Sequence, residues 1–325
     1  MGTSGALRSV DPNRCGVSSA HRALLYGSEQ EFLAGTVGFI RDGLECGDPV
    51  RIVTTQRNTA WLQAALGTDA RQVAFGDTGQ WCGHPVRALA ALHRAVQAAS
   101  RDGHRLRMVG ERLWTARAAQ ERMEWSRHES LVNAVLRSGD AALVCSYDTQ
   151  VVDPDVVANV GRTHPELVVN GESRPSPGYT DPVVFNAEFN RFPLPELGPP
   201  VLWLRFRRLD QLAILRSFVT SHATDAGAVT PSVGQFVQAV DEVATNAVEH
   251  GGGSGVLQIW TGPQTIVCEV SDTGTGLLDP LAGRLPPDNC TAHGHGLWLA
   301  RQFSDLLEVH SDSAGTTIRL HLNLH

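Results

Sequence analysis

Residues 233–251 read Val-Gly-Gln-Phe-Val-Gln-Ala-Val-Asp-Glu-Val-Ala-Thr-Asn-Ala-Val-Glu-His-Gly, and they combine an apolar helical pattern with a row of polar side chains. A helix advances about 100° per residue, so Glu242, Asn246 and His250 align along one side of it. A mostly buried helix seldom carries an acid, an amide and an imidazole in a row for structural reasons alone. We therefore interpret this row as a candidate ligand site.

The size and charge of the chain limit the classes of protein to consider. Its 325 residues exceed what one compact core usually holds, so we expect two domains. A net charge of -7 argues against general nucleic-acid binding and against binding to anionic membranes. The sequence has neither an apolar run of about 20 residues nor the pattern of a secretory signal, so we expect a cytoplasmic protein.

The cysteines and the basic residues exclude several kinds of site. The six cysteines are widely spaced without a Cys-x-x-Cys pair, so we expect reduced thiols and no structural zinc site. Lysine is absent, and all 27 basic residues are arginine. P-loops, protein kinases of the eukaryotic type and Schiff-base enzymes all need a lysine. Any ATP would therefore have its phosphates held by backbone amides, arginine or a metal ion.

The N-terminal part of the chain predicts an α/β domain. Residues 1–18 have the composition of a disordered tail, and residues 19–172 alternate strand and helix patterns. Such alternation predicts a mostly parallel sheet with helices on both faces. Ligands gather at the carboxyl ends of such strands, where Tyr26, Glu111, Trp114, Tyr147 and Asp148 are expected. Buried aromatic rings usually pack and an Asp can cap a turn, so their roles stay open.

The C-terminal part predicts an α+β domain after a linker. Residues 173–200 are rich in proline, which interrupts any helix, so they read as a linker in which residues 183–185 and Phe189 can lie against a domain. Residues 201–325 predict an antiparallel or mixed sheet with helices on one face. Ser232 with Gln235 suggests a capping box at the start of the central helix.

Two glycine turns follow the central helix in sequence. Asp272 ends a predicted strand, and Gly274 and Gly276 let a flat base approach the backbone. A carboxylate there can accept a hydrogen bond from the exocyclic amine of adenine, although Asp-x-Gly-x-Gly is also common in ordinary turns. Gly294 and Gly296 open the last predicted helix, where backbone amides can hold phosphate without lysine, or the glycines can simply form a turn.

The central row supplies the remaining chemistry. Asn246 offers an amide oxygen to Mg²⁺, and Glu242 can accept the proton of an attacking hydroxyl group. His250 can contact phosphate or can stabilise the helix end.

Taken in order, these motifs resemble the N, G1 and G2 boxes of the GHKL (Bergerat-fold) ATPases, in particular the RsbW-like anti-sigma regulatory factor serine/threonine kinases. The resemblance covers residues 201–325 and implies a Bergerat-type α/β sandwich with a lid at residues 277–293. The resemblance implies ATP and Mg²⁺ as cofactors and Glu242 as the catalytic base. The cofactor-binding residues are Asn246 as Mg²⁺ ligand, Asp272 as adenine reader, Gly274 and Gly276 as base platform, Gly294 and Gly296 at phosphate, Thr317 beside adenine, and His250 near phosphate.

Short motifs in the first domain resemble the MEDS (methanogen/methylotroph DcmR-type sensory) domain. They are His21 to Tyr26, Gly110 to Trp114, Glu129 with Asn133, Cys145 to Asp148, and His164-Pro165. This resemblance implies a RecA- or KaiC-like sheet that senses a small molecule or another signal. Because no P-loop is present, it implies sensing or partner binding and not hydrolysis.

The combined prediction is a sensory domain that controls a kinase of the anti-sigma factor type. The resemblance implies a sigma factor and an anti-sigma-factor antagonist as partners, with phosphate transferred to Ser or Thr of the antagonist. The alternative is a nucleotide-binding protein-interaction switch without phosphotransfer. The sequence leaves open the signal, the identity of the partners and the oligomeric state, a homodimer included.

Overall fold

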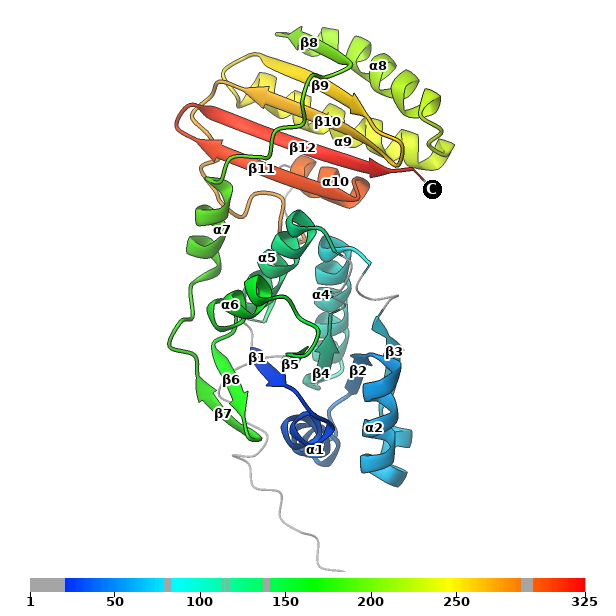
Figure 1. Cartoon of the computed structure of the whole chain (residues 1–325), viewed down its shortest axis with the longest axis vertical. Coiled ribbons are helices and arrows are strands. Elements are labelled where there is room, and N and C mark those ends of the chain that lie inside the picture. Colours follow the sequence, from blue (N-terminus) through cyan, green and yellow to red (C-terminus); the bar gives the residue numbers. More distant parts are fainter. Residues whose placement is uncertain are drawn as a thin grey trace, which may run out of the picture. The chain divides into compact units, whose positions relative to one another are not determined.

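The structure, a computed structural model, describes residues 21–78, 83–112, 114, 117–136, 141–287 and 295–324. The chain divides into two compact units (Figure 1). The first unit takes residues up to 118 and residues 132–180, and the second takes residues 119–131 and 181–325. The predicted disordered tail lies outside the described residues.

The first unit is built on a seven-stranded sheet, which confirms the predicted α/β fold. Its strands pair in parallel, except for the last, which is antiparallel to its neighbour. In spatial order the strands are β3 (Ala74–Asp77), β2 (Val50–Thr54), β4 (Leu106–Glu111), β5 (Ala141–Asp148), β1 (His21–Tyr26), β6 (Glu166–Val169) and β7 (Glu172–Pro175).

Helices cover both faces of this sheet. Helices α1 (Glu29–Glu45) and α2 (Gln56–Leu66) lie on one face, and α4 (Pro85–Arg101) and α6 (Pro154–Thr163) lie on the other (Figure 1). A short 3-10 helix, η1 (Gly67–Gln72), follows α2. The first two helices lead the chain towards β3, whereas the other two lead it back towards β7. Right-handed crossovers in opposite directions place the two pairs on opposite faces.

The state of the thiols differs in part from the prediction. Cys145 and Cys268 are reduced and buried, whereas Cys46, at the end of α1, is disulfide-bonded. The prediction of six reduced cysteines is therefore wrong for Cys46, because spacing along the sequence does not reveal which thiols the fold brings together.

The second unit contains a five-stranded sheet. All its neighbouring strands pair antiparallel, which is one of the two arrangements predicted. In spatial order the strands are β11 (Leu306–Asp312), β12 (Gly315–Asn323), β10 (Thr265–Asp272), β9 (Gly255–Thr261) and β8 (Leu202–Phe206).

Three helices pack on one face of this sheet, as predicted (Figure 1). They are α8 (Leu212–Asp225), α9 (Thr230–Glu249) and α10 (Gly296–Phe303), with the short 3-10 helix η2 (Leu209–Gln211) before α8. The central helix α9 buries Phe236, Val240 and Val243 in the core. Fully burying such a side chain contributes roughly 1.5–3 kcal/mol, so this face alone holds α9 firmly on the sheet.

Two local predictions are wrong for the same reason. Helix α7 (Pro182–Asn190) forms inside the predicted linker, and α9 begins at Thr230 and not after a Ser232 capping box. In both helices a proline stands in the first turn, where its missing N–H costs nothing. Phe185 and Phe189 of α7 are buried, as the sequence suggested.

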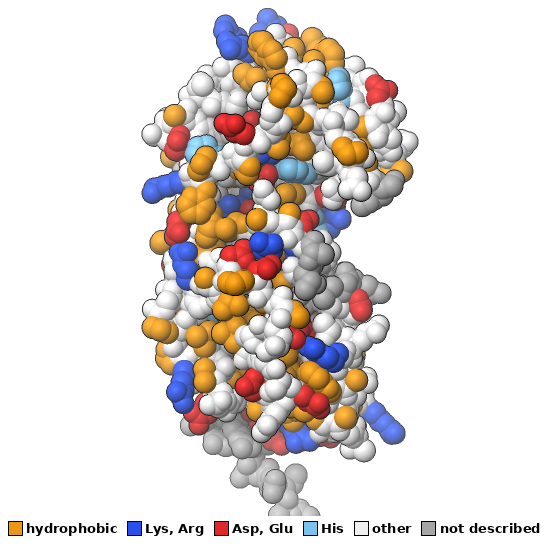
Figure 2. Space-filling model, in the orientation of Figure 1, with side chains coloured by type: hydrophobic (Ala, Val, Ile, Leu, Met, Phe, Trp, Pro, Cys, Tyr) orange, Lys and Arg blue, Asp and Glu red, His pale blue; other side chains and the backbone are white. Residues whose placement is uncertain are grey.

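None of the helices in the described part of the chain combines the length and the apolar character needed to span a bilayer. On the face drawn in Figure 2, acidic and basic side chains of the described residues are interspersed. This mixture is typical of a surface without a strong field of one sign.

The second unit also contains a buried cluster of ions centred on Glu124. This residue lies on α5 (Ala119–Val135), in the segment that groups with the second unit. Its carboxylate accepts hydrogen bonds from Arg284 at 3.0 and 3.2 Å, and Arg127 and Arg301 lie 3.4 and 3.6 Å away. Burial alone would raise the pKa of Glu124, but the three guanidinium charges outweigh it and hold the pKa at about 2.

The arginines of this cluster are fixed by other contacts as well. Arg127 donates to the side chains of Asn186 and Asn190 on α7, and Arg301 donates to the carbonyl of Leu307. Burial and the nearby Arg284 lower the pKa of Arg301 to about 9. The positive charges depend on one carboxylate, so removal of that carboxylate should be costly.

We expect Glu124→Gln to destabilise the second unit by about 3–5 kcal/mol, because it leaves three buried guanidinium groups without their counter-ion. Denaturant unfolding of the full chain measures this change. The matched control is Asp210→Asn, which breaks the Asp210–Arg208 pair with side chains 58% and 73% exposed, and should cost at most about 1 kcal/mol.

The stabilisation that Glu124 provides should also depend on pH. The pKa of Glu124 is lower in the folded than in the unfolded protein, so its stabilisation is complete above about pH 4.5 and is lost as the pH falls towards 2. The stability difference between wild type and Glu124→Gln should therefore shrink as the pH is lowered through this range. Equal losses in Glu124→Gln and Asp210→Asn at neutral pH would contradict the role given to the cluster.

Candidate functional site

The second unit has a cavity of about 670 Å³ beside its central helix. Its walls come from the C-terminal half of α9, the ends of β10 and β12, residues 275–285 and the first residues of α10. The cavity therefore lies where the three predicted motifs of this unit meet.

Two of the three residues of the polar row of α9 lie in the wall of this cavity. Asn246 and His250 line it, and His250 is exposed at the helix end, where its backbone N–H donates to the carbonyl of Asn246. Glu242 lies one turn earlier, against the first residue of α10. A Cβ atom at Gly296 would lie only 2.6 Å from Oε2 of Glu242 and 3.6 Å from Nδ2 of Asn246. The glycine thus lets the start of α10 come close to the acid and the amide.

Asp272 is held at the end of β10, facing the cavity. Its Oδ1 accepts hydrogen bonds from the backbone N–H of Gly274 at 2.9 Å and of Thr316 at 3.2 Å. Burial raises the pKa of Asp272, and these two backbone N–H groups oppose the increase. The carboxylate is therefore oriented through one oxygen, and Oδ2 has acceptor capacity for a ligand.

Two glycines make this arrangement sterically feasible. Gly251 follows α9, and a Cβ there would lie 2.6 Å from Oδ2 of Asp272, so a larger residue would displace the carboxylate. Gly276 has a φ of 80°, and its Cβ would meet the carbonyl oxygen of Asp312. Both the left-handed backbone and the close approach require glycine at this turn.

The segment after Gly276 forms an apolar wall of the cavity. Leu277, Leu281 and Leu285 line it, and the N–H of Leu277 donates to Oγ of Ser311 at 2.7 Å. Arg284, between the lining residues Gly283 and Leu285, points instead into the buried Glu124 cluster. The predicted lid is therefore anchored to α5 in its described part. Its remaining residues, 288–293, lie outside the described residues.

The structure brings most of the predicted residues together. Asn246, His250, Asp272, Gly276 and Gly296 line the cavity. Gly274 packs on Gly251, and Glu242 abuts Gly296. Gly294 lies outside the described residues.

Thr317 is not among the lining residues, whereas its neighbours Thr316 and Ile318 are. Side chains alternate along a strand, so a shift of one residue moves the contact to the other face of β12. Gly251 was not predicted to be a site residue either, although it directly follows His250 in the sequence.

A second polar cluster lies at the carboxyl ends of the strands in the first unit. The hydroxyl of Tyr26 donates to Oε1 of Glu111 at 2.6 Å, and Nδ2 of Asn58 lies 2.7 Å from the tyrosine oxygen and 2.8 Å from Oε2 of Glu111. Burial and the charge of Glu111 raise the pKa of Tyr26. Nearby, Arg57 donates to Asp148 at 2.5 Å. Tyr26, Glu111 and Asn58 form a buried network, to which Asn58 contributes without having been predicted, whereas the side chain of Arg57 is 52% exposed.

Two models of protein families match the chain, one in its N-terminal part and one in its C-terminal part. Residues 20–165 match the model of the MEDS domain, described as the methanogen/methylotroph, DcmR sensory domain. Residues 207–322 match the model of the histidine kinase-like ATPase domain, and this range contains the whole cavity. The comparison with curated proteins found no match. The chain therefore combines an N-terminal MEDS sensory domain with a C-terminal histidine kinase-like ATPase domain.

Proposed function

We propose that this protein is a signal-regulated serine/threonine kinase that uses ATP with Mg²⁺ and acts as an anti-sigma factor. The observation that carries the proposal is the convergence of Asp272, Asn246 and the start of α10 on one cavity, with Glu242 beside them. The match to the ATPase domain supports ATP binding with a divalent metal. The anti-sigma activity and the protein acceptor rest on the resemblance of the three boxes to RsbW-like kinases.

The carboxylate of Asp272 suits adenine. Its Oδ1 already accepts two backbone hydrogen bonds, so Oδ2 is the oxygen that would accept from the exocyclic amine of the base. Guanine carries a carbonyl group at the same ring position, which would face the carboxylate without a proton between them. The site should therefore prefer adenine to guanine nucleotides.

The donor groups around the cavity also fit phosphate and Mg²⁺. The backbone of Gly296 opens α10, where N–H groups can hold phosphate oxygens without lysine. The amide oxygen of Asn246 is a hard ligand of the type that Mg²⁺ accepts while it keeps several waters. When bound, the ion would neutralise charge on the phosphates.

Glu242 is the candidate base for transfer. It would accept the proton of a Ser or Thr hydroxyl as that oxygen bonds to the γ-phosphorus of ATP and the bond to the bridging oxygen breaks, which releases ADP. Its carboxylate stands beside Gly296, at the end of the cavity assigned to the phosphates.

The contact of α5 with the lid suggests how the sensory part would control the kinase. Residues 119–131 fall inside the MEDS match, yet they group with the second unit. Glu124 of this segment binds Arg284 of the lid at 3.0 Å. A signal that moved α5 would therefore change the anchorage of the lid.

We expect Asp272→Asn to weaken ATP binding roughly 10- to 100-fold, which corresponds to a hydrogen bond between a charged and a neutral group. Isothermal titration of the full chain with ATP, ADP and GTP measures the effect. The control Asp210→Asn, on an exposed pair of the same unit, should bind ATP like the wild type. Wild-type affinity in Asp272→Asn, or equal affinity of the wild type for GTP and ATP, would contradict the adenine assignment.

Asn246→Ala should remove the gain in ATP affinity that Mg²⁺ confers, because the variant lacks the amide oxygen assigned to the ion. Titrations with ATP in magnesium and in chelator measure the gain as a ratio of two dissociation constants. The ratio should fall close to one in the variant, whereas an unchanged ratio would exclude Asn246 as the metal ligand.

Glu242→Gln should lower phosphotransfer about 10²- to 10⁴-fold while ATP still binds, because the amide cannot accept the proton. Transfer of labelled γ-phosphate to candidate anti-sigma-factor antagonists measures it. Asp241→Asn is the matched control, since the neighbouring Asp241 pairs at 2.8 Å with Arg216 and should be dispensable for transfer. ATP binding by the wild type without transfer to any antagonist would favour the alternative of a switch without kinase activity.

A further inference from the structure

Three ligating side chains of the first unit lie together in its interior. His21 begins β1, Cys145 lies on the adjacent strand β5, and His164 directly follows α6. Each is at most 3% exposed, and their ligand atoms lie within 4.8 Å of one another. Cys145 pairs in register with Ala23, two residues after His21, so the two side chains point to the same face of the sheet. The two imidazole rings have their centroids 4.1 Å apart.

The surroundings of His21 fix the position of its proton. Nδ2 of Asn133 donates to the carbonyl of Thr163 at 2.7 Å, so the amide is oriented with Oδ1 towards the histidine. This oxygen lies 3.0 Å from Nδ1 of His21 and can only accept. Nδ1 therefore carries the proton, and Nε2 keeps its lone pair. The Sγ atom of Cys145, 3.3 Å from Nε2, donates its thiol proton to that lone pair.

The surroundings of His164 lead to the same tautomer. Its Nδ1 lies 2.9 Å from the carbonyl oxygen of Val160, which can only accept, so Nδ1 carries the proton. The hydroxyl of Thr163, 3.0 Å from the same nitrogen, donates to the carbonyl of Asn159 and is free to accept as well. The buried Nε2 of His164 therefore also bears a lone pair.

Two imidazole lone pairs and one thiol thus converge in the buried interior of the unit. Buried histidines often serve packing alone, but packing does not require that both rings turn the same nitrogen inward and bind protein oxygens with the other. That arrangement is the one that orients histidines towards a metal ion. Two imidazoles with a thiolate suit Zn²⁺ and similar thiophilic cations, and not Mg²⁺ or Ca²⁺.

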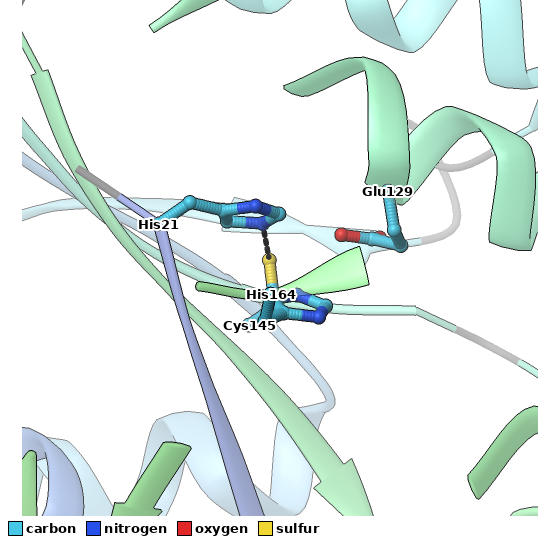
Figure 3. Close-up of side chains that lie close together, drawn as sticks. All are labelled: His21, Glu129, Cys145 and His164. Carbon is cyan, nitrogen blue, oxygen red and sulfur yellow. Dashed lines mark hydrogen bonds between the residues drawn. The ribbon is translucent and has the colours of Figure 1, made fainter. Parts of the chain in front are cut away.

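We propose that His21, Cys145 and His164 form a binding site for a thiophilic divalent transition-metal ion, with Zn²⁺ as the ion of choice. On binding, the thiol of Cys145 loses its proton to solvent, and the thiolate and the two Nε2 atoms ligate the ion. These residues supply three of the four ligands of a tetrahedral zinc site. Figure 3 shows the three side chains, together with Glu129 of α5.

Co²⁺ is a direct probe of this site, because it takes the same ligands as Zn²⁺ and its thiolate-to-metal charge-transfer absorption reports sulfur coordination. We expect the chelator-treated full chain to bind one Co²⁺ with this absorption, and one equivalent of Zn²⁺ to abolish it. Cys145→Ser should lose the charge-transfer band. His164→Gln should bind the ion at least tenfold more weakly.

Two further variants separate metal binding from structural effects. Asn133→Ala should keep the band but weaken binding about 10- to 100-fold, because it removes the partner that orients His21 and leaves all three ligands in place. Cys268→Ala, at a reduced and buried thiol of the second unit, should leave the spectrum unchanged. Circular dichroism verifies the fold of each variant.

The absence of the charge-transfer band in folded wild-type protein at saturating Co²⁺ would overturn the proposal, as would an undiminished band in Cys145→Ser. Should Cys145→Ser fail to fold, wild-type Co²⁺ affinity in both His164→Gln and Asn133→Ala would overturn it equally. These measurements need no nucleotide, so they are independent of the proposed kinase activity.

Discussion

The burial of one face of α9 on the antiparallel sheet is the constraint on which the candidate site depends. Phe236, Val240 and Val243 lock the helix into the core, and interiors are packed too densely to let it slide or rotate. The helical period then fixes where Asn246 emerges beside the end of β10. Gly251 completes the fit, since the chain leaves α9 in direct contact with the carboxylate of Asp272. The hydrophobic core therefore determines the geometry of the polar groups.

The absence of lysine gives the cavity an unusual electrostatic character. Its described lining residues include neither lysine nor arginine. Three arginines of the same unit are paired with carboxylates: Arg284 and Arg301 bind Glu124, and Arg319 binds Glu269 at 2.7 Å. A triphosphate in this cavity would meet backbone dipoles and a metal ion as its positive partners. Such a site depends more on the ion than one that has a lysine or an arginine in place.

The sequence predicted the parts of the structure that local patterns govern. The alternation of strands and helices in the first unit and the helical row of Glu242, Asn246 and His250 follow from hydrophobic periodicity, and both are present. Predictions that depended on the role of a single residue were less accurate. Proline at the first turn of α7 starts a helix as readily as it ends one, so composition alone suggested a linker. In β12 the side chains alternate between the two faces of the strand, so Thr316 lines the cavity and the adjacent Thr317 does not. A sequence motif does not distinguish two adjacent positions.

Other features were beyond prediction because they depend on contacts between distant residues. Glu124 and Arg284 are separated by 160 positions, and no local pattern marks either as a member of a buried ion cluster. Asn58 of α2 likewise meets Tyr26 and Glu111, at the ends of β1 and β4, only when the chain folds. The order of the motifs indicates that Asp272 and Asn246 share a site. It does not predict their mutual orientation, which depends on the glycines between the elements that carry them.

Helix α5 has a position in the chain that suits transmission of a signal. It supplies Asn133 to the first unit, where the amide binds Nδ1 of His21, and it supplies Glu124 to the second unit, where the carboxylate binds the lid. His21 and α5 are joined by the hydrogen bond to Asn133, and α5 and Arg284 are joined by the buried ion pair of Glu124. The loss of the Glu124–Arg284 pair would be costly, because both side chains are buried and water cannot replace the missing partner. A helix held at both places by such bonds is the kind of element that converts a local chemical event into a shift between two packed states.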